Sequence, residues 1–224
     1  MLIVVPDVLT KDEIRKITET VKDVDFADGR ETAGARTQAI KNNLQTHDNT
    51  DPELQALVLA ALQRNGLFNT VAAPQHILPP RFNLYKEGMY YGDHVDNAIM
   101  RDDGENVRID CSFTLFISDA KDYDGGELVV KGPQGPTAFK LPAGHMVVYP
   151  TYYYHEVTPV TRGERLACVT WLQSMIRDPA KREILLELAL ASSHIEGAGN
   201  AAMGQAISHL DRARKNLLRT WADT

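Results

Sequence analysis

The residues most suited to chemistry lie between positions 85 and 96, and the centre of this stretch is His94-Val95-Asp96. In a β-strand, side chains two residues apart point to the same face. An imidazole and a carboxylate at this spacing can therefore bind one metal ion from a single strand. Taken alone the pattern is weak, because a chain of this length often contains a His-x-Asp by chance, with the histidine at the surface.

A second strand-like run, residues 154–157, contains His155. Together with His94 and Asp96 it would complete a set of two histidines and one carboxylate. That set leaves one face of an octahedral metal ion open, as in non-haem Fe(II) oxygenases. Arg165 follows ten residues later, and its planar guanidinium can bind a small dicarboxylic acid. The sequence therefore predicts an open metal site beside an anion-binding arginine.

Each of these residues also has a structural explanation when it is considered alone. A histidine such as His94 or His155 is more often a surface or hydrogen-bonded core residue than a metal ligand. Asp96 alone is more often a solvated charge, and Arg165 alone can belong to a surface salt bridge that stabilises little. Their order along one predicted β fold favours the functional interpretation. The other histidines lack such companions and are interpreted as structural: His47, His76, His145, His194 and His209.

Length and composition indicate one sizeable soluble domain, or one domain with helical additions, since 43% of the 224 residues are hydrophobic and 24% are charged. The net charge of −6 does not indicate binding to nucleic acid. No window of the sequence has the roughly 18 apolar residues of a membrane span. Residues 1–6 are too short for a signal peptide and lack its basic residues, so we expect a cytoplasmic protein. In that compartment Cys111 and Cys168 are expected to be buried, reduced thiols.

Helical patterns dominate the first third of the chain. Thr10 and Glu13 form a capping box, and apolar residues at helical spacing follow up to Val24. A second helix is predicted over residues 51–66, with proline in its first turn and Asn-Gly at its end. Both apolar stripes are interpreted as packing against a sheet.

From Ile77 onward the pattern changes to short strands at regular spacing, separated by glycine and proline turns. This is typical of an antiparallel double-sheet jelly roll. The mouth of such a barrel brings together residues from distant strands, which explains how His94 and His155 can meet. We further expect residues 97–106, which are rich in Asp, Gly and Arg, to form a mobile lid over the metal.

We therefore predict an α+β fold with a mainly β core, a double-stranded β-helix (jelly roll) that has N-terminal packing helices and a C-terminal helical extension. Residues 1–76 form the N-terminal helical segment that packs on the barrel, 77–177 the jelly-roll core, and 178–224 the extension. We expect the extension to mediate self-association as well as to cover the barrel. Its last helix carries an apolar stripe at helical spacing: Met203, Ile207, Leu210, Leu217 and Trp221.

The segment from Tyr85 to Trp171 resembles the Fe(II)- and 2-oxoglutarate-dependent dioxygenases of the prolyl 4-hydroxylase type. More narrowly, the chain resembles the bacterial PKHD-type hydroxylases, and this likeness extends to residues 28–34, residues 41–43 and the helical tail. The motifs are specific for the use of cofactors and only weakly specific for substrate. They comprise Tyr85-x-x-Gly88-x-x-Tyr91-x-x-His94-x-Asp96, Asp124-Gly-Gly-Glu-Leu128, Pro142-x-Gly144, His155, Arg165 and Trp171.

The resemblance implies that His94, Asp96 and His155 bind Fe(II). It also implies an oxidoreductase that hydroxylates a substrate with O2 and 2-oxoglutarate, releases succinate and CO2, and uses L-ascorbate (vitamin C) as reductant. The substrate is a peptidyl prolyl or lysyl residue or a small molecule. Asp96 excludes a halogenase, because the related halogenases replace this carboxylate to make room for halide.

For the cosubstrate, the resemblance implies that Arg165 pairs with the distal carboxylate of 2-oxoglutarate and that Tyr85 or Tyr91 hydrogen-bonds it. One departure concerns the strand over residues 113–116, where some relatives have a second tyrosine. Here Thr114 or a tyrosine from another strand must substitute, or the contact is absent.

Two other classes fit the same metal site. One is a jelly-roll metalloenzyme that uses Zn²⁺ or Mn²⁺ without a redox step, in which Arg165 and the tyrosines have no role. Tight binding of 2-oxoglutarate would exclude it. The other is a non-catalytic jelly-roll binding module of the kind found in lectins. Failure to bind any transition metal would favour that module.

Overall fold

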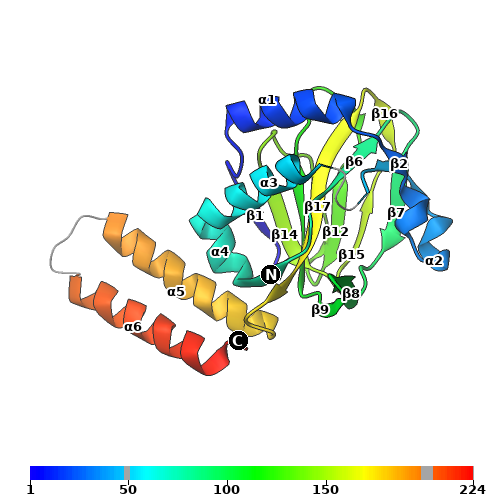
Figure 1. Ribbon diagram of the computed structural model, residues 1–224. Coiled ribbons are helices and arrows are strands. Elements are labelled where there is room, and N and C mark those ends of the chain that lie inside the picture. The colour runs from blue at the N-terminus through cyan, green and yellow to red at the C-terminus, as the bar shows by residue number, and fades with distance from the viewer. Residues whose placement is uncertain (48–50, 198–203, 224) are drawn as a thin grey trace.

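Two antiparallel β-sheets form the centre of the molecule (Figure 1) in a computed structural model that describes residues 1–47, 51–197 and 204–223. The larger sheet has eight strands in the order β1-β14-β10-β17-β6-β4-β2, and β5 also pairs with β17. Its strands are β1 (Ile3–Val5), β2 (Ala27–Asp28), β4 (Leu44–Gln45), β5 (Pro74–Ile77), β6 (Arg81–Tyr85), β10 (Cys111–Phe116), β14 (Met146–Pro150) and β17 (Arg165–Ser174).

The smaller sheet has five strands in the order β13-β12-β15-β7-β3. They are β3 (Lys41–Asn42), β7 (Tyr90–His94), β12 (Leu128–Gly132), β13 (Gly135–Phe139) and β15 (Tyr154–Val157). Phe116 and Tyr149 of the larger sheet pack against Leu128 and Val130 of the smaller one. The sheets therefore enclose a common interior, which confirms the predicted jelly roll.

The outer face of the larger sheet is apolar and covered by helices. Side chains such as Phe113 and Val148 pack there against Ile17 of α1 (Lys11–Thr20), Val58 of α3 (Pro52–Arg64) and Phe68 of α4 (Gly66–Ala72). Figure 1 shows these helices side by side on that face. This layer is the main hydrophobic core of the protein.

The inner face of the same sheet carries many polar side chains. Ser112 and Thr114 alternate on β10 with the outward-facing residues. On β6, Tyr85 lies opposite Arg165 of β17, and Asn83 lies opposite Gln45 of β4. The two-residue period of the strands therefore sends mostly apolar residues to the helices and a mixture of polar and apolar residues to the interior.

The N-terminal helices begin where the sequence predicts. The Thr10 hydroxyl accepts a hydrogen bond from the Glu13 N–H, and the Glu13 carboxylate accepts one from the Thr10 N–H, so the capping box is confirmed. The Asp51 side chain caps α3, with Pro52 as its first residue. Asn65 then caps α4, a helix that the sequence analysis missed.

The helical description of residues 1–76 also missed short strands. Residues 3–5 pair with β14, residues 41–42 with β7, and residues 44–45 with β6. Strands of two or three residues have too little alternation to be recognised in a sequence. The first third of the chain therefore contributes strands to both sheets. Its other short elements are η1 (Val21–Asp23), η2 (Gly29–Thr32) and α2 (Ala35–Gln38).

Residues 97–106 are mostly a β-hairpin and not a plain loop. Strands β8 (Ile99–Asp102) and β9 (Glu105–Arg108) pair across a tight turn. Asp103 and Gly104 have φ values of +47° and +86°, as the primed turns of two-residue hairpins require. The motion of a lid stays a prediction. A second small pairing joins β11 (Asp124–Gly125) to β16 (Val160–Arg162).

The C-terminal helices α5 (Pro179–Gly197) and α6 (Gly204–Trp221) form an antiparallel pair that extends away from the sheets (Figure 1). Leu217 and Trp221 pack with Ile176 and Leu185 at its base. The predicted helix break at 197–199 lies largely outside the described residues, as does Met203 of the predicted stripe. In the part of the chain that the structure describes, no helix has the length and apolar character that a bilayer crossing requires.

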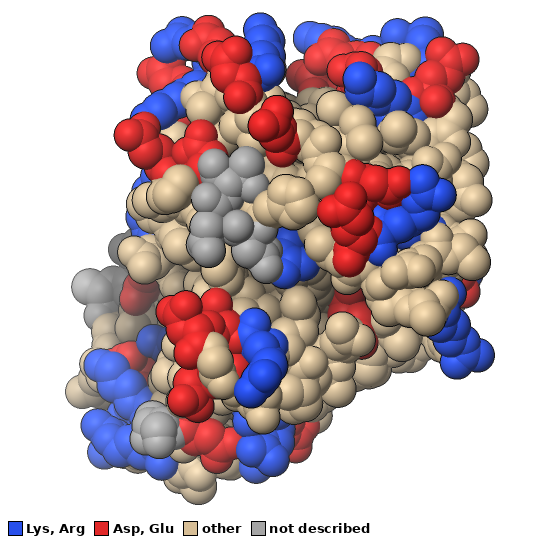
Figure 2. All heavy atoms as spheres, turned by 45° about the vertical axis from the view of Figure 1, so that its right-hand side comes forward, with Lys and Arg blue, Asp and Glu red and all other residues tan. Residues whose placement is uncertain are grey.

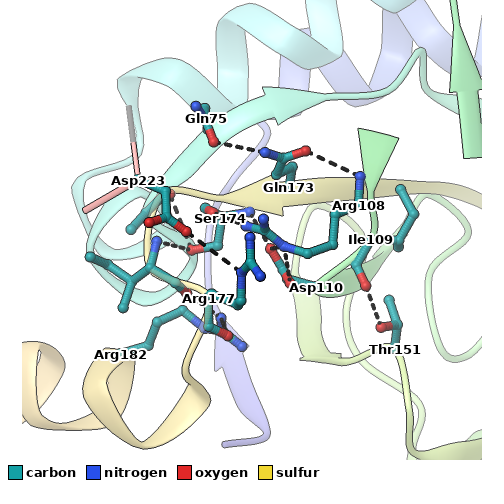
Figure 3. A network of polar contacts seen from close by, with 12 residues as sticks. Gln75, Arg108, Ile109, Asp110, Thr151, Gln173, Ser174, Arg177, Arg182 and Asp223 are labelled. Carbon is teal, nitrogen blue, oxygen red and sulfur yellow. Dashed lines mark hydrogen bonds and ion pairs between the residues drawn. The ribbon is translucent and has the colours of Figure 1, made fainter. Parts of the chain in front are cut away.

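A polar network fixes this helical pair to the end of β17 (Figure 3). Asp110 accepts hydrogen bonds from the Arg108 guanidinium and from the Ser174 N–H. The Arg182 guanidinium donates to the carbonyl of Ile176, and Arg177 lies 3.6 Å from Asp223. The extension is therefore attached to the sheet through backbone groups as well as apolar contacts.

Candidate metal centre and cosubstrate pocket

His94, Asp96 and His155 converge as the sequence predicts. His94 is the last residue of β7 and lies directly opposite His155 of β15, with 4.2 Å between the ring centroids. One ligand atom from each of the three residues lies within 4.8 Å of the others. Both histidines are almost fully buried. The group therefore has the composition and spacing of a metal site.

Asp96 reaches this group by a route that differs from the predicted one. β7 ends at His94, so Asp96 does not share a strand with it. The Ser112 hydroxyl of β10 donates a hydrogen bond to Asp96 Oδ2, which lies 3.8 Å from His155 Nε2. The larger sheet thus holds the carboxylate in place.

The two imidazoles are oriented by backbone carbonyl groups. His94 Nδ1 lies 2.8 Å from the carbonyl oxygen of Gly92, and His155 Nδ1 lies 3.1 Å from that of Tyr153. A carbonyl only accepts, so each Nδ1 carries the proton and each Nε2 is left with a free lone pair. Burial, followed by the neighbouring His155, lowers the pKa of His94 to about 4. The neutral form that binds metals is therefore favoured near neutral pH.

A β-bulge brings Tyr91 to the same face as His94. His155 pairs with His94 and Val157 pairs with Tyr91, so two residues of β7, Gly92 and Asp93, stand opposite the single residue Glu156 between these points. The Tyr91 ring stacks on the His94 ring, with 3.7 Å between centroids and 19° between planes. Gly92 lies inside the bulge, where an added Cβ would stand only 3.0 Å from the Ile40 Cβ. The bulge thus packs an aromatic ring against one imidazole.

Arg165 occupies the interior beside the metal group. Its side chain is 1% exposed and its Cζ lies 5.2 Å from the ring centroids of both Tyr85 and Phe116. Its Nε and Nη2 have no hydrogen-bond partner, and neither does the buried hydroxyl of Tyr123. An unpartnered guanidinium is costly to bury. The geometry therefore calls for an anionic ligand at this point.

Gly126 makes room for the arginine. An added Cβ would stand 3.0 Å from Arg165 Cδ and 3.2 Å from a ring carbon of Tyr123, and φ is +65°. The Asp-Gly-Gly motif that the sequence analysis quoted therefore has a steric reason. Tyr123 itself was missed, because it precedes this turn in a segment without strand alternation.

Tyr149 of β14 is a second site residue that the sequence analysis did not name. It is buried opposite Ser112, and its ring centroid lies 5.0 Å from that of His155. Burial, and then the charge of Asp96, raises the pKa of its hydroxyl. Burial likewise raises the pKa of Tyr85 to about 12. Tyr149 is thus the tyrosine from another strand that could take the place of the one absent from residues 113–116.

Residues 80–173 match the model of the 2OG-Fe(II) oxygenase superfamily. A prolyl-4-hydroxylase from Pseudomonas putida has a similar structure, with a TM-score of 0.59 and 24% identity over 77% of this chain and 92% of that one. HygX from Streptomyces hygroscopicus, solved with nickel, 2-oxoglutarate and hygromycin B, has a TM-score of 0.57 and 12% identity over 77% of this chain and 82% of that one. The jelly-roll fold is shared with these proteins, and the matched segment is similar to the 2-oxoglutarate- and Fe(II)-dependent oxygenases.

Relatives that match over the full length of the chain identify a family within this class of oxygenases. A PKHD-type hydroxylase of Nitrosomonas europaea is 44% identical over 100% of both chains. Another, of Xanthomonas campestris pv. campestris, is 43% identical over 100% of both. The chain belongs to the PKHD-type hydroxylases. It is therefore an oxidoreductase that hydroxylates its substrate with Fe(II), O2 and 2-oxoglutarate and releases succinate and CO2.

Proposed function

We propose that Fe(II) is bound by His94, Asp96 and His155. The observation that carries this proposal is the arrangement of two buried imidazoles whose Nδ1 atoms face carbonyl oxygens, so that both Nε2 atoms are free beside one carboxylate. Two histidines and one carboxylate leave coordination positions open for cosubstrate and O2. The Ser112 hydroxyl and the Tyr91 ring hold two of these ligands in position.

Arg165 then binds the distal carboxylate of 2-oxoglutarate. Its Nε and Nη2 and the Tyr123 hydroxyl are buried donors without acceptors, and a carboxylate would satisfy them. Of the two tyrosines expected at the cosubstrate, Tyr85 adjoins Arg165 and Tyr91 adjoins His94. Tyr149 is a third candidate for a hydrogen bond to the cosubstrate.

With Fe(II) and 2-oxoglutarate bound, O2 is reduced by oxidative decarboxylation of the cosubstrate, and a substrate C–H bond is hydroxylated. The chain supplies position and a shielded interior for this chemistry. Tyr85 and Phe116 flank the cosubstrate arginine, and Val130 lies opposite His155 in the smaller sheet. These side chains exclude water from the site.

The substrate is a peptidyl prolyl or lysyl residue or a small molecule. Both kinds of ligand occur on this fold: a prolyl hydroxylase from Trichoplax adhaerens was solved with a peptide fragment of hypoxia inducible factor, and HygX with hygromycin B. L-ascorbate acts as the reductant, and the protein works in the cytoplasm. Dependence of repeated turnover on ascorbate tests the choice of reductant.

The three-part division at residues 76/77 and 177/178 stays part of the proposal, as does self-association through the extension. Ile184 and Leu190 of α5 are 47% and 36% exposed, which supports an apolar contact with a second copy. Light scattering that shows a monomer at all working concentrations would exclude self-association.

In Figure 2, basic and acidic side chains lie beside one another on the face shown, which gives no support for a nucleic-acid partner.

The decisive experiment measures binding of Fe(II) and 2-oxoglutarate without oxygen, followed by a screen for compounds that stimulate release of succinate. We expect binding of 2-oxoglutarate to depend on the metal and to be lost when His155 is replaced by alanine. Binding of 2-oxoglutarate that is unchanged in His155→Ala would place the metal elsewhere.

A further inference from the structure

Lys41 is a buried cation close to the proposed iron site that the proposed function does not use. It lies on β3 directly opposite Tyr91 and is 8% exposed. Its Nζ donates to Gln45 Oε1 at 2.8 Å and to Thr32 Oγ1 at 3.1 Å, and it lies 5.1 Å from the centroid of the Tyr91 ring. All three contacts are with neutral groups. No carboxylate from the described residues forms an ion pair with this ammonium.

Further unsatisfied atoms lie beside this lysine. Gln45 is 3% exposed, and its Nε2 has no hydrogen-bond partner, because its Oε1 is turned toward Lys41. The ammonium has three N–H donors, of which these contacts use two. One donor of Lys41 and the amide nitrogen of Gln45 are therefore buried close to one another without a partner. Two adjacent donors of this kind match the two oxygens of one carboxylate.

The burial of Lys41 favours an anionic partner. Burial, and then the charge of Arg81, lowers the pKa of Lys41 to about 8, while Asp96 and Asp28 act in the opposite direction. A charge that is buried without an opposite charge destabilises the folded protein. An anionic ligand would remove this penalty.

These donors are distinct from the cosubstrate arginine. Gln45 pairs with Asn83, which is two residues from Tyr85 on β6, and Tyr85 is the residue that pairs with Arg165. Lys41 enters from the smaller sheet beside Tyr91, whose ring also stacks on His94. The interior therefore holds one cation for the cosubstrate and another beside the metal ligands.

We propose that Lys41 and Gln45 form a subsite for a carboxylate of the hydroxylated substrate. This inference rests on the proposed function, because it assigns Arg165 to 2-oxoglutarate. The substrate is then a carboxylic acid, such as an amino acid or a chain-terminal residue, held so that a C–H bond near its carboxylate faces the metal. A prolyl or lysyl residue inside a peptide chain has no such carboxylate and does not fit this subsite.

The test uses the full-length protein loaded without oxygen with Fe(II) and N-oxalylglycine, an inert analogue that fills the cosubstrate site. Acetate is titrated at constant ionic strength, acetamide serves as the neutral counterpart, and binding is measured by calorimetry. We expect acetate to bind the parent, and Lys41→Met to bind it about ten- to a hundredfold more weakly. Lys181→Met is the matched control, because Lys181 also lies over an aromatic ring, 5.4 Å from the centroid of Trp221 in the C-terminal extension. Equal acetate binding in parent and Lys41→Met, or none in the parent, would overturn the proposal.

A second measurement separates this proposal from the proposed function. The Fe(II) complex of 2-oxoglutarate absorbs visible light, so its formation can be followed by absorbance in the same variants. We expect Lys41→Met to form this complex with the affinity of the parent. A parent without the complex would contradict the proposed function, whereas loss of the complex in Lys41→Met alone would assign Lys41 to the cosubstrate and overturn the substrate subsite.

Discussion

The two faces of the larger sheet are built from the same strands and serve different ends. The outer face is packed by helices with apolar side chains such as Phe113, Leu115 and Cys168. Toward the interior, several buried polar atoms have no partner in the described protein, among them two of Arg165 and one of Gln45. Burying such atoms lowers stability unless a ligand satisfies them. Apolar packing is therefore concentrated on one face of the sheet and unsatisfied polar atoms on the other.

Replacement of a proposed metal ligand should have the largest effect and should be confined to the interior. Asp96→Ala removes one of three ligands, so we expect iron binding and succinate release to fall by more than about a hundredfold, since loss of a supporting residue alone costs about ten- to a hundredfold. Iron content and succinate release are measured on the purified protein. Asp93→Ala is the control, because Asp93 faces outward and pairs with Lys131 at 3.0 Å. An Asp96→Ala protein that retains iron would show that Asp96 is not a metal ligand.

A substitution on the outer face should lower the stability of the protein and leave its iron binding unchanged. Phe113 is fully buried and packs edge-on against Phe68, with 5.8 Å between ring centroids. We expect Phe113→Ala to lower the free energy of unfolding by about 3–5 kcal/mol, because it leaves a cavity in the main core. Urea denaturation measures this loss, and the folded fraction should bind Fe(II) as tightly as the parent. Weaker iron binding by the folded fraction would show that the two faces are coupled.

A conservative change at the cosubstrate arginine should have a smaller effect. Lysine offers a point charge in place of the planar fork, so we expect Arg165→Lys to weaken binding of 2-oxoglutarate by about 1.5–3 kcal/mol, or ten- to a hundredfold. Iron content should stay unchanged. Arg162→Lys is the control, because Arg162 is exposed and pairs with Asp124. Equal affinity in Arg165→Lys and the parent would reduce Arg165 to a structural residue.

The smallest expected effect is a pH dependence of the free energy of unfolding, which arises from His94 in the interior. The pKa of His94 is about 4 in the folded protein, below the ordinary value of 6.5. The unfolded chain therefore binds this proton first as the pH falls, so stability is lost progressively between about pH 6.5 and 4. Urea unfolding of the metal-free protein at pH 7 and pH 5 measures this loss, and His94→Gln should show a shallower pH dependence. The same dependence in both proteins would assign it to other groups.

The jelly roll and the metal triad could be predicted from the sequence, because both leave local patterns. Tyr149 could not, since every residue of β14 is buried and alternation therefore says nothing about which side chains face inward. The convergence of Tyr91 with His94 depends on a bulge, which shifts the two-residue period without a mark in the sequence. Lys41 lies in residues 41–43, which share the family likeness, but the sequence indicates no role for it, because its burial comes from tertiary pairing of a two-residue strand.

The position of the two cysteines affects how readily their thiols are oxidised. Cys111 and Cys168 are free thiols that face the helices, on the side of the sheet away from the proposed iron site. Burial raises the pKa of Cys111 to about 11 and raises that of Cys168 as well, so little of the reactive thiolate forms at neutral pH. In an enzyme that activates O2, turnover without substrate endangers the side chains nearest the metal. The side chains against the proposed ligands are the Tyr91 and Tyr149 rings and the Ser112 hydroxyl. Both thiols lie on the other face of the sheet, which separates them from oxidants formed at the site.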